Sequence, residues 1–125
     1  MLFRSVRTES VGPTASDPAI TEHLTWIHDG DWAAYKYLDF GSGVSFFHAR
    51  TGSLAYGGSI EVHCDQPDGP LLCVCDVPHT GGWNRWAMVR ADVRTPVSGP
   101  HALYLVFRGG IGRLFNLDGF WFARS

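Results

Sequence analysis

Apolar and polar residues alternate along this chain in short runs, and turn residues separate the runs. Ile60, Val62 and Cys64 occupy alternate positions, and the apolar residues of 103–107 do the same. Alternation with a period of two places one set of side chains on a single face of a β-strand. Apolar residues spaced at i, i+3, i+4 and i+7 over the length of a helix do not occur. The pattern therefore predicts an all-β chain.

Strands are predicted wherever such a run is bounded by Gly, Pro, Asp or Ser residues. The predicted ranges are 3–9, 23–27, 31–39, 44–50, 59–65, 71–77, 86–93, 102–107 and 117–122. Short strands at this spacing favour an antiparallel sandwich or barrel. A chain of 125 residues is long enough for one two-sheet core. We therefore expect a single domain over residues 1–125.

Composition and charge exclude several classes of partner. The chain is 45% apolar and 18% charged, so it can bury enough surface to fold, which excludes disorder. A formal net charge of −2 offers no basic field, and we expect neither nucleic acid nor a membrane as partner. Residues 1–11 contain no apolar run of signal-peptide length. The chain is thus either intracellular or a domain of a longer secreted protein.

Three cysteines, Cys64, Cys73 and Cys75, surround one predicted turn. An odd number does not form a disulfide framework. We interpret them as small apolar strand residues, because a zinc site needs at least one more well-placed ligand. His63 is adjacent, but it is predicted to point to the opposite face from Cys64.

The sequence contains no recognisable catalytic motif. It lacks a nucleophile elbow, a phosphate-binding loop and the common zinc motifs, and its six histidines are scattered. Asp29, Asp31 and Glu61 are the candidate paired carboxylates for glycoside hydrolysis. Asp-Gly-Asp is, however, a common turn sequence. A catalytic domain using Asp31 or Glu61 remains an alternative, and we favour a protein that is not an enzyme.

Two of the five tryptophans stand at loop borders. Trp26 precedes the turn at 28–30, and Trp83 directly follows Gly81-Gly82. Two exposed indoles at one rim would stack on the apolar faces of a sugar ring, with Asn116 in a nearby loop bonding its hydroxyls. Position alone equally allows both indoles to be core residues.

The other three tryptophans lie on predicted strands. Trp86 and Trp121 alternate with apolar neighbours and are predicted to lie in the core. Trp32 begins a strand, and its sequence position favours neither the core nor the surface.

Six ordered blocks of the sequence, between about residues 26 and 122, resemble family 6 of the carbohydrate-binding modules. The blocks are 26–41, 57–62, 65–71, 77–86, 97–107 and 114–118, and the most specific reads Val-Pro-His-Thr-Gly-Gly-Trp-Asn-Arg-Trp at 77–86. The resemblance implies a lectin-like antiparallel β-sandwich, a jelly roll of the galactose-binding-like type. It also implies binding of a β-linked polysaccharide such as xylan or β-glucan without cleavage, and attachment to a secreted, hence extracellular, glycoside hydrolase.

The family's binding residues can be carried over to this chain one by one. A cleft among the loops at one end of the sandwich corresponds to Trp26, Trp83 and Asn116, with Glu9 as an acidic residue at its edge. A second cleft, which some members have on a sheet face, corresponds to Trp32 and Glu61.

Two departures from the family bear on metal binding and association. The first strand of the family, whose glutamates help to bind a structural calcium, is missing or altered here, which leaves Asp118 as the candidate calcium ligand. The family commonly has Trp where this chain has Gly119, and we expect Trp121 to compensate. The missing strand would leave an open sheet edge for a homodimer or for a partner domain. A sandwich that binds other proteins through this edge, with no affinity for carbohydrate, is a further alternative.

Overall fold

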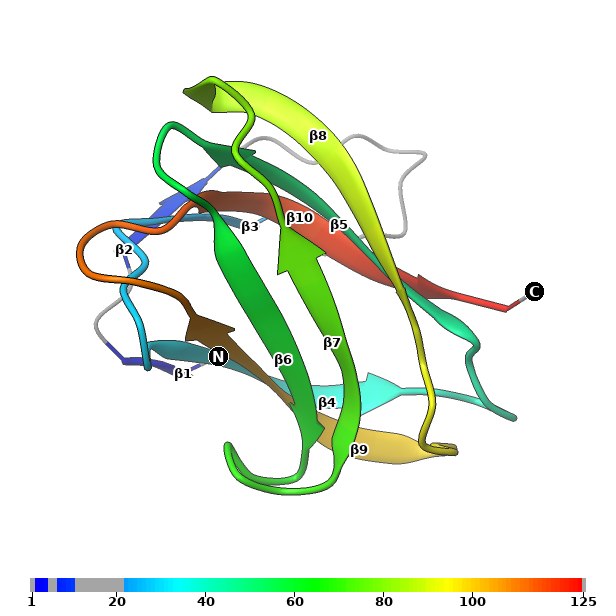
Figure 1. Cartoon of the computed structure of the whole chain (residues 1–125). Helices are drawn as coiled ribbons and strands as arrows, with labels where there is room; N and C mark the ends of the chain where they lie inside the picture. Colours follow the sequence, from blue (N-terminus) through cyan, green and yellow to red (C-terminus); the bar gives the residue numbers. More distant parts are fainter. Residues whose placement is uncertain (1, 5–6, 11–21, 125) are drawn as a thin grey trace.

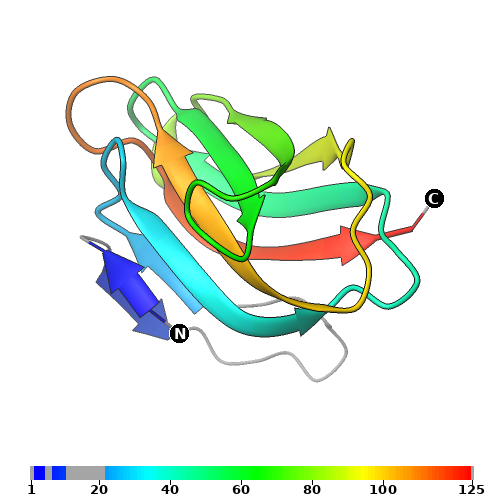
Figure 2. The same ribbon diagram turned by 90° about the horizontal axis from the view of Figure 1, so that it is seen from below.

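The protein, as a computed structural model, folds into two antiparallel sheets that face each other (Figures 1 and 2). The structure describes residues 2–4, 7–10 and 22–124, with side chains from Leu24 onward except at 36–37. In spatial order the first sheet contains β1 (Leu2–Arg4), β4 (Trp32–Asp39), β9 (Pro100–Arg108), β6 (Gly58–Cys64) and β7 (Leu71–Val77). The second contains β2 (Arg7–Ser10), β3 (Glu22–Thr25), β10 (Asn116–Ala123), β5 (Phe46–Ser53) and β8 (Gly82–Asp92). The predicted all-β sandwich is therefore confirmed.

The core lies between the two sheets and is rich in aromatic side chains. Phe47, Phe107 and Phe120 are each no more than 1% exposed, and they come from β5, β9 and β10. The rings of Phe47 and Phe120 lie 5.8 Å apart, which is normal packing for aromatic pairs. The predicted alternation is confirmed, since the apolar residues of 60–64 and of 103–107 that share a face are buried.

All three cysteines are buried core residues, as predicted: Cys64 ends β6, and the other two lie on β7. Cys73 and Cys75 are free and buried on the same face of the strand. Burial raises the pKa of Cys73 to about 12 and that of Cys75 to about 11, because a thiolate is poorly solvated there. Both side chains therefore act as small apolar groups.

The N-terminal strand prediction, 3–9, is wrong in one respect. Its residues form two strands in different sheets: β1 pairs with β4, and β2 pairs with β3. Each strand stands at one edge of its sheet. A pattern of alternation cannot reveal where a chain passes from one sheet to the other, because the period is the same on both sides.

The prediction that Trp86 and Trp121 lie in the core is also wrong. Both are only half-buried, and their partners are polar: Trp121 stacks on the His48 ring at 5.0 Å, and the Arg50 guanidinium lies 6.0 Å from the Trp86 ring. On β8 the inward positions belong to Val89 and its alternate neighbours. Both indoles therefore lie on the outer face of the second sheet.

A β-bulge explains the error at Trp121. The register between β10 and β5 shifts between Leu117 and Gly119, so one extra residue stands on β10. Regular alternation from the buried Leu117 would place Trp121 inside. The extra residue reverses the alternation, and Phe120 is buried instead.

None of the described residues forms a helix, and hence none forms an apolar helix long enough to cross a membrane.

Candidate ligand-binding site

Three segments far apart in the sequence meet at one end of the second sheet. They are the turn 26–31 after β3, the loop 109–115 before β10, and the beginning of β8 (the turn and the loop lie side by side at the left of Figure 1). The Leu114 N–H donates to the Ile27 carbonyl at 2.8 Å, and the Gly109 N–H donates to Asp29 Oδ1 at 3.1 Å. These bonds fix the loop against the turn and so build one continuous surface.

The turn 26–31 presents Trp26 to solvent. Trp26 has φ +60, in the left-handed region that L residues other than Asn and Asp rarely adopt, and its side chain is 44% exposed. Asp31 Oδ2 accepts the His28 N–H at 2.9 Å, and the Asp31 N–H donates to the His28 carbonyl. This pair of bonds closes the turn and holds the strained residue beside it.

The carboxylates considered for catalysis have structural partners instead. Asp29 and Asp31 each accept a backbone N–H, as described above, and Asp31 is buried. Glu61 lies on β6 and bonds to His63 and Arg108. These contacts account for all three residues without a catalytic pair.

Arg113 stands between the two predicted stacking residues. Its guanidinium carbon lies 4.7 Å from the centre of the Trp26 ring and 4.0 Å from that of Trp83. Both distances are within the range of a cation–π interaction. One planar group therefore contacts both indoles. Arg113 was missed from the sequence, where its only signal is a cation among the glycines of the loop before Asn116.

Asn116 contacts both Arg113 and Trp83. Its side chain is only 2% exposed; Oδ1 accepts a hydrogen bond from Arg113 Nη2 at 2.9 Å, and Nδ2 donates to the Trp83 carbonyl at 3.0 Å. Asn116 pairs with Gly52 on β5, the strand between β10 and β8. A Cβ at Gly52 would lie 2.6 Å from the Trp83 carbonyl oxygen, so only glycine allows this approach.

The structure brings together Trp26, Trp83 and Asn116, and their role in binding carbohydrate stays a prediction. Glu9 belongs to β2, where it pairs with His23. The side chain of Glu9 lies outside the described residues, so its place at this site stays a prediction.

The second predicted pair lies on the outer face of the first sheet. Trp32 on β4 and Glu61 on β6 both pair with Val106 on β9, so the three side chains share a face. Glu61 Oε1 lies 3.0 Å from His63 Nε2, and Oε2 accepts from Arg108 Nε at 3.4 Å. A surface hollow beside this face is lined by Asp29, Gly30, Asp31, Trp32, Pro67, Asp68, Val106 and Arg108.

The candidate calcium ligand, Asp118, has a cationic neighbour. Its Oδ2 lies 3.4 Å from Arg50 Nε. A calcium ion needs about six to eight oxygen ligands. The positive charge of the Arg50 guanidinium would repel a calcium ion bound to Asp118. The described residues around Asp118 therefore do not fit calcium. Calcium binding elsewhere in this chain stays a prediction.

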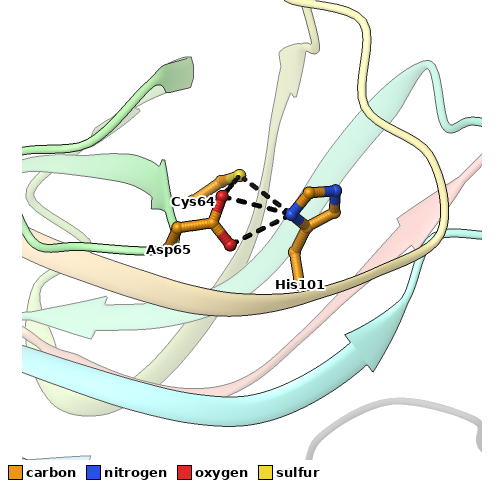
Figure 3. Close-up of side chains that lie close together, drawn as sticks. All are labelled: Cys64, Asp65 and His101. Carbon is orange, nitrogen blue, oxygen red and sulfur yellow. Dashed lines mark hydrogen bonds and ion pairs between the residues drawn. The ribbon is translucent and has the colours of Figure 1, made fainter.

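A third cluster of side chains lies in the first sheet, at the end remote from the loops 26–31 and 109–115. There β6 ends and β9 begins. Asp65 Oδ1 lies 3.0 Å from His101 Nδ1, and Cys64 Sγ donates to Asp65 Oδ2 at 3.2 Å (Figure 3). These contacts lower the pKa of Asp65, which accepts hydrogen bonds from both partners, and raise that of His101. Burial and the Asp65 carboxylate raise the pKa of Cys64 to about 11.

Comparison with known proteins agrees with this architecture. The family model described as "Carbohydrate binding module (family 6)" matches residues 6–124. An arabinoxylan arabinofuranohydrolase of Paenibacillus polymyxa is 42% identical over 108 residues, which cover 85% of this chain and 17% of that protein. The chain thus spans about a fifth or less of the length of such curated relatives.

Solved structures of similar fold include two family 6 modules. One, from Clostridium cellulolyticum in complex with xylose, is 35% identical and superposes with a TM-score of 0.85, covering 98% of this chain and 89% of that one. The other, a β-1,3-glucan-binding module from Bacillus halodurans, is 33% identical and also has a TM-score of 0.85, covering 99% and 89%.

Proposed function

The chain belongs to family 6 of the carbohydrate-binding modules, and we propose that it binds a neutral β-linked polysaccharide in the loop-end cleft between Trp26 and Trp83. It is a non-catalytic carbohydrate-binding module. The observation that carries the proposal is the pair of indoles that flank one flat group at distances of 4.0 and 4.7 Å. A pyranose ring in that position would place an apolar face against each indole and remove both from water.

Two further observations support a xylan or a β-glucan as ligand. One similar structure holds xylose, and another belongs to a module that binds β-1,3-glucan. The chain has a formal net charge of only −2, which suits a neutral glycan recognised by stacking and by hydroxyl contacts. The curated relatives are longer hydrolases, of which this chain matches only a part. We therefore propose that the chain directs an attached glycoside hydrolase to its substrate outside the cell.

Calorimetric titration with soluble xylo-, cello- and laminari-oligosaccharides tests this proposal. We expect saturable binding of at least one series and no release of reducing sugar. If none of the three series binds and the polysaccharides do not retard the protein in affinity electrophoresis, the proposed ligand class is wrong. Light scattering in the same samples tests the homodimer, which stays a prediction.

The pair Trp32 and Glu61 is proposed as a second cleft. Their shared face and the adjacent hollow support it. A stoichiometry of two sugars per chain that returns to one in Trp32→Ala would agree with this proposal. A stoichiometry of one in the unsubstituted protein would contradict it.

Arg113 is expected to compete with the sugar for the loop-end cleft. Its guanidinium occupies the space between the indoles and bonds the Asn116 oxygen, so a ring that enters must displace it from all three residues. We expect Arg113→Ala to raise the affinity for a neutral oligosaccharide by about 3- to 10-fold, which matches one cation–π contact of roughly 1 kcal/mol.

Calorimetry on Arg113→Ala measures this effect, with Arg94→Ala as the matched control. The Arg94 side chain is 82% exposed and lies beyond the other end of β8. The control should bind as the unsubstituted protein does. A loss of affinity in Arg113→Ala would instead make the guanidinium a direct contact of the sugar.

A further inference from the structure

Cys64, Asp65 and His101 bring three different ligand atoms together at the end remote from the cleft (Figure 3). Cys64 Sγ lies 3.2 Å from Asp65 Oδ2 and 3.6 Å from His101 Nδ1, and Asp65 Oδ1 lies 3.0 Å from the same nitrogen. Thiolate, imidazole and carboxylate are the three protein ligands of zinc. From these distances we propose that this cluster binds one zinc ion.

The spacing of the three atoms fits a common tetrahedral centre. Zinc bonds sulfur at about 2.3 Å and imidazole nitrogen at about 2.0–2.1 Å, so tetrahedral geometry separates the two ligand atoms by roughly 3.5 Å. The distance from Cys64 Sγ to His101 Nδ1 is 3.6 Å. Asp65 Oδ2 lies 3.2 Å from the sulfur and 3.2 Å from the nitrogen, within about 0.4 Å of the tetrahedral values for an oxygen ligand.

The second nitrogen of the imidazole supports the assignment of Nδ1 as a ligand atom. His101 Nε2 lies 2.9 Å from the Ser98 carbonyl oxygen, which accepts hydrogen bonds only, so Nε2 carries a proton. A histidine that binds zinc through one nitrogen ordinarily donates from the other in this way, which fixes the ring. In the metal-free protein Nδ1 donates to the Asp65 carboxylate, so zinc takes the place of this proton, which passes to solvent.

The backbone holds the other two ligands in place. The Cys64 N–H donates to the Pro70 carbonyl at 3.0 Å, and the Asp65 N–H donates to the Ala102 carbonyl at 2.8 Å. Asp65 also has φ +73, a left-handed conformation at the point where β6 has ended. Cys64 is the last residue of β6, Asp65 follows it, and His101 is the second residue of β9, the neighbouring strand in the sheet.

Access from solvent also favours an ion at this position. The side chains of Asp65 and His101 are 52% and 31% exposed, so an ion can enter from solvent, whereas Cys64 is buried. On binding, Cys64 coordinates as the thiolate and its proton passes to solvent. Three protein ligands leave one tetrahedral position for water.

Titration of the purified, metal-free protein with Zn²⁺ tests the proposal. We expect one ion per chain with Kd in about the micromolar range, and a loss of at least about 10-fold in Cys64→Ser and in His101→Gln. Substitution with Co²⁺ gives an independent signal, because a tetrahedral thiolate site shows sulfur-to-cobalt charge transfer in the near ultraviolet that Cys64→Ser abolishes.

His79→Gln is the matched control, since His79 is an exposed histidine on another segment. It should bind Zn²⁺ as the unsubstituted protein does. Cys64→Ser leaves the contact between Asp65 and His101 in place, so it separates loss of metal from loss of fold. Absence of saturable Zn²⁺ binding, or unchanged binding and unchanged cobalt spectra in Cys64→Ser, would overturn the proposal.

Discussion

Replacement of Trp83 by alanine is expected to lower the affinity for the glycan by about 30-fold or more and to leave the fold intact. Trp83 lies closer to the flat group in the cleft than Trp26 does, at 4.0 Å against 4.7 Å. Aromatic residues at the centre of a binding site commonly contribute about 2 kcal/mol or more, and 1.4 kcal/mol is a factor of ten. Calorimetry with the best-binding oligosaccharide measures the effect.

The matched control is Trp121→Ala. Trp121 is also a half-buried tryptophan at the end of a ring stack, but it lies on the outer face of the second sheet. Its loss should change the affinity by less than about 2-fold, since it has no contact with the cleft. Equal losses in the two variants would place the binding site elsewhere.

Gly57→Ala is expected to lower the free energy of unfolding by about 3 kcal/mol or more. Gly57 has φ +78, and a Cβ there would lie 1.9 Å from the Val77 carbonyl oxygen. Alanine would meet both a disfavoured backbone conformation and a backbone atom that cannot move without β7, and such combinations belong to the few large single-residue effects. The midpoint and slope of urea unfolding measure the loss.

Two other glycines separate the effect of the positive φ from the effect of the close backbone atom. Gly99 has φ +72 with nothing within 4 Å of a built Cβ, and Gly110 has neither the positive φ nor a neighbour. We expect Gly99→Ala to cost roughly 1 kcal/mol and Gly110→Ala to cost less than about 0.5 kcal/mol. A Gly57→Ala variant no less stable than Gly99→Ala would show that β6 and β7 move apart easily.

Local pattern predicts most of this fold because sandwich strands alternate by a simple rule. Runs bounded by turn residues predict the range 71–77 as the structure has it, and alternation predicts the inward faces of 60–64 and 103–107. The rule fails where the register changes. At Trp121 a bulge reverses the alternation, and a bulge depends on the partner strand, which a local pattern does not contain.

Only those residues of the site that lie in the sequence blocks resembling the family could be predicted. Trp26, Trp83 and Asn116 follow from matched sequence blocks, and the structure places them together. The position of Arg113 between two indoles depends on loops 26–31 and 109–115 folding against each other. The contact between Cys64 and His101 likewise joins residues 37 apart in sequence, and only the pairing of β6 with β9 brings them together.

The backbone conformation of Trp26 has a consequence for attempts to improve this module. A φ of +60 penalises almost every residue except glycine and asparagine, so the indole is displayed at the expense of local stability. Selection for heat resistance alone will favour small or amide residues at this position and will discard half of the stacking pair. Thermostable versions of the domain should therefore be selected on immobilised glycan, where stability and recognition are screened together.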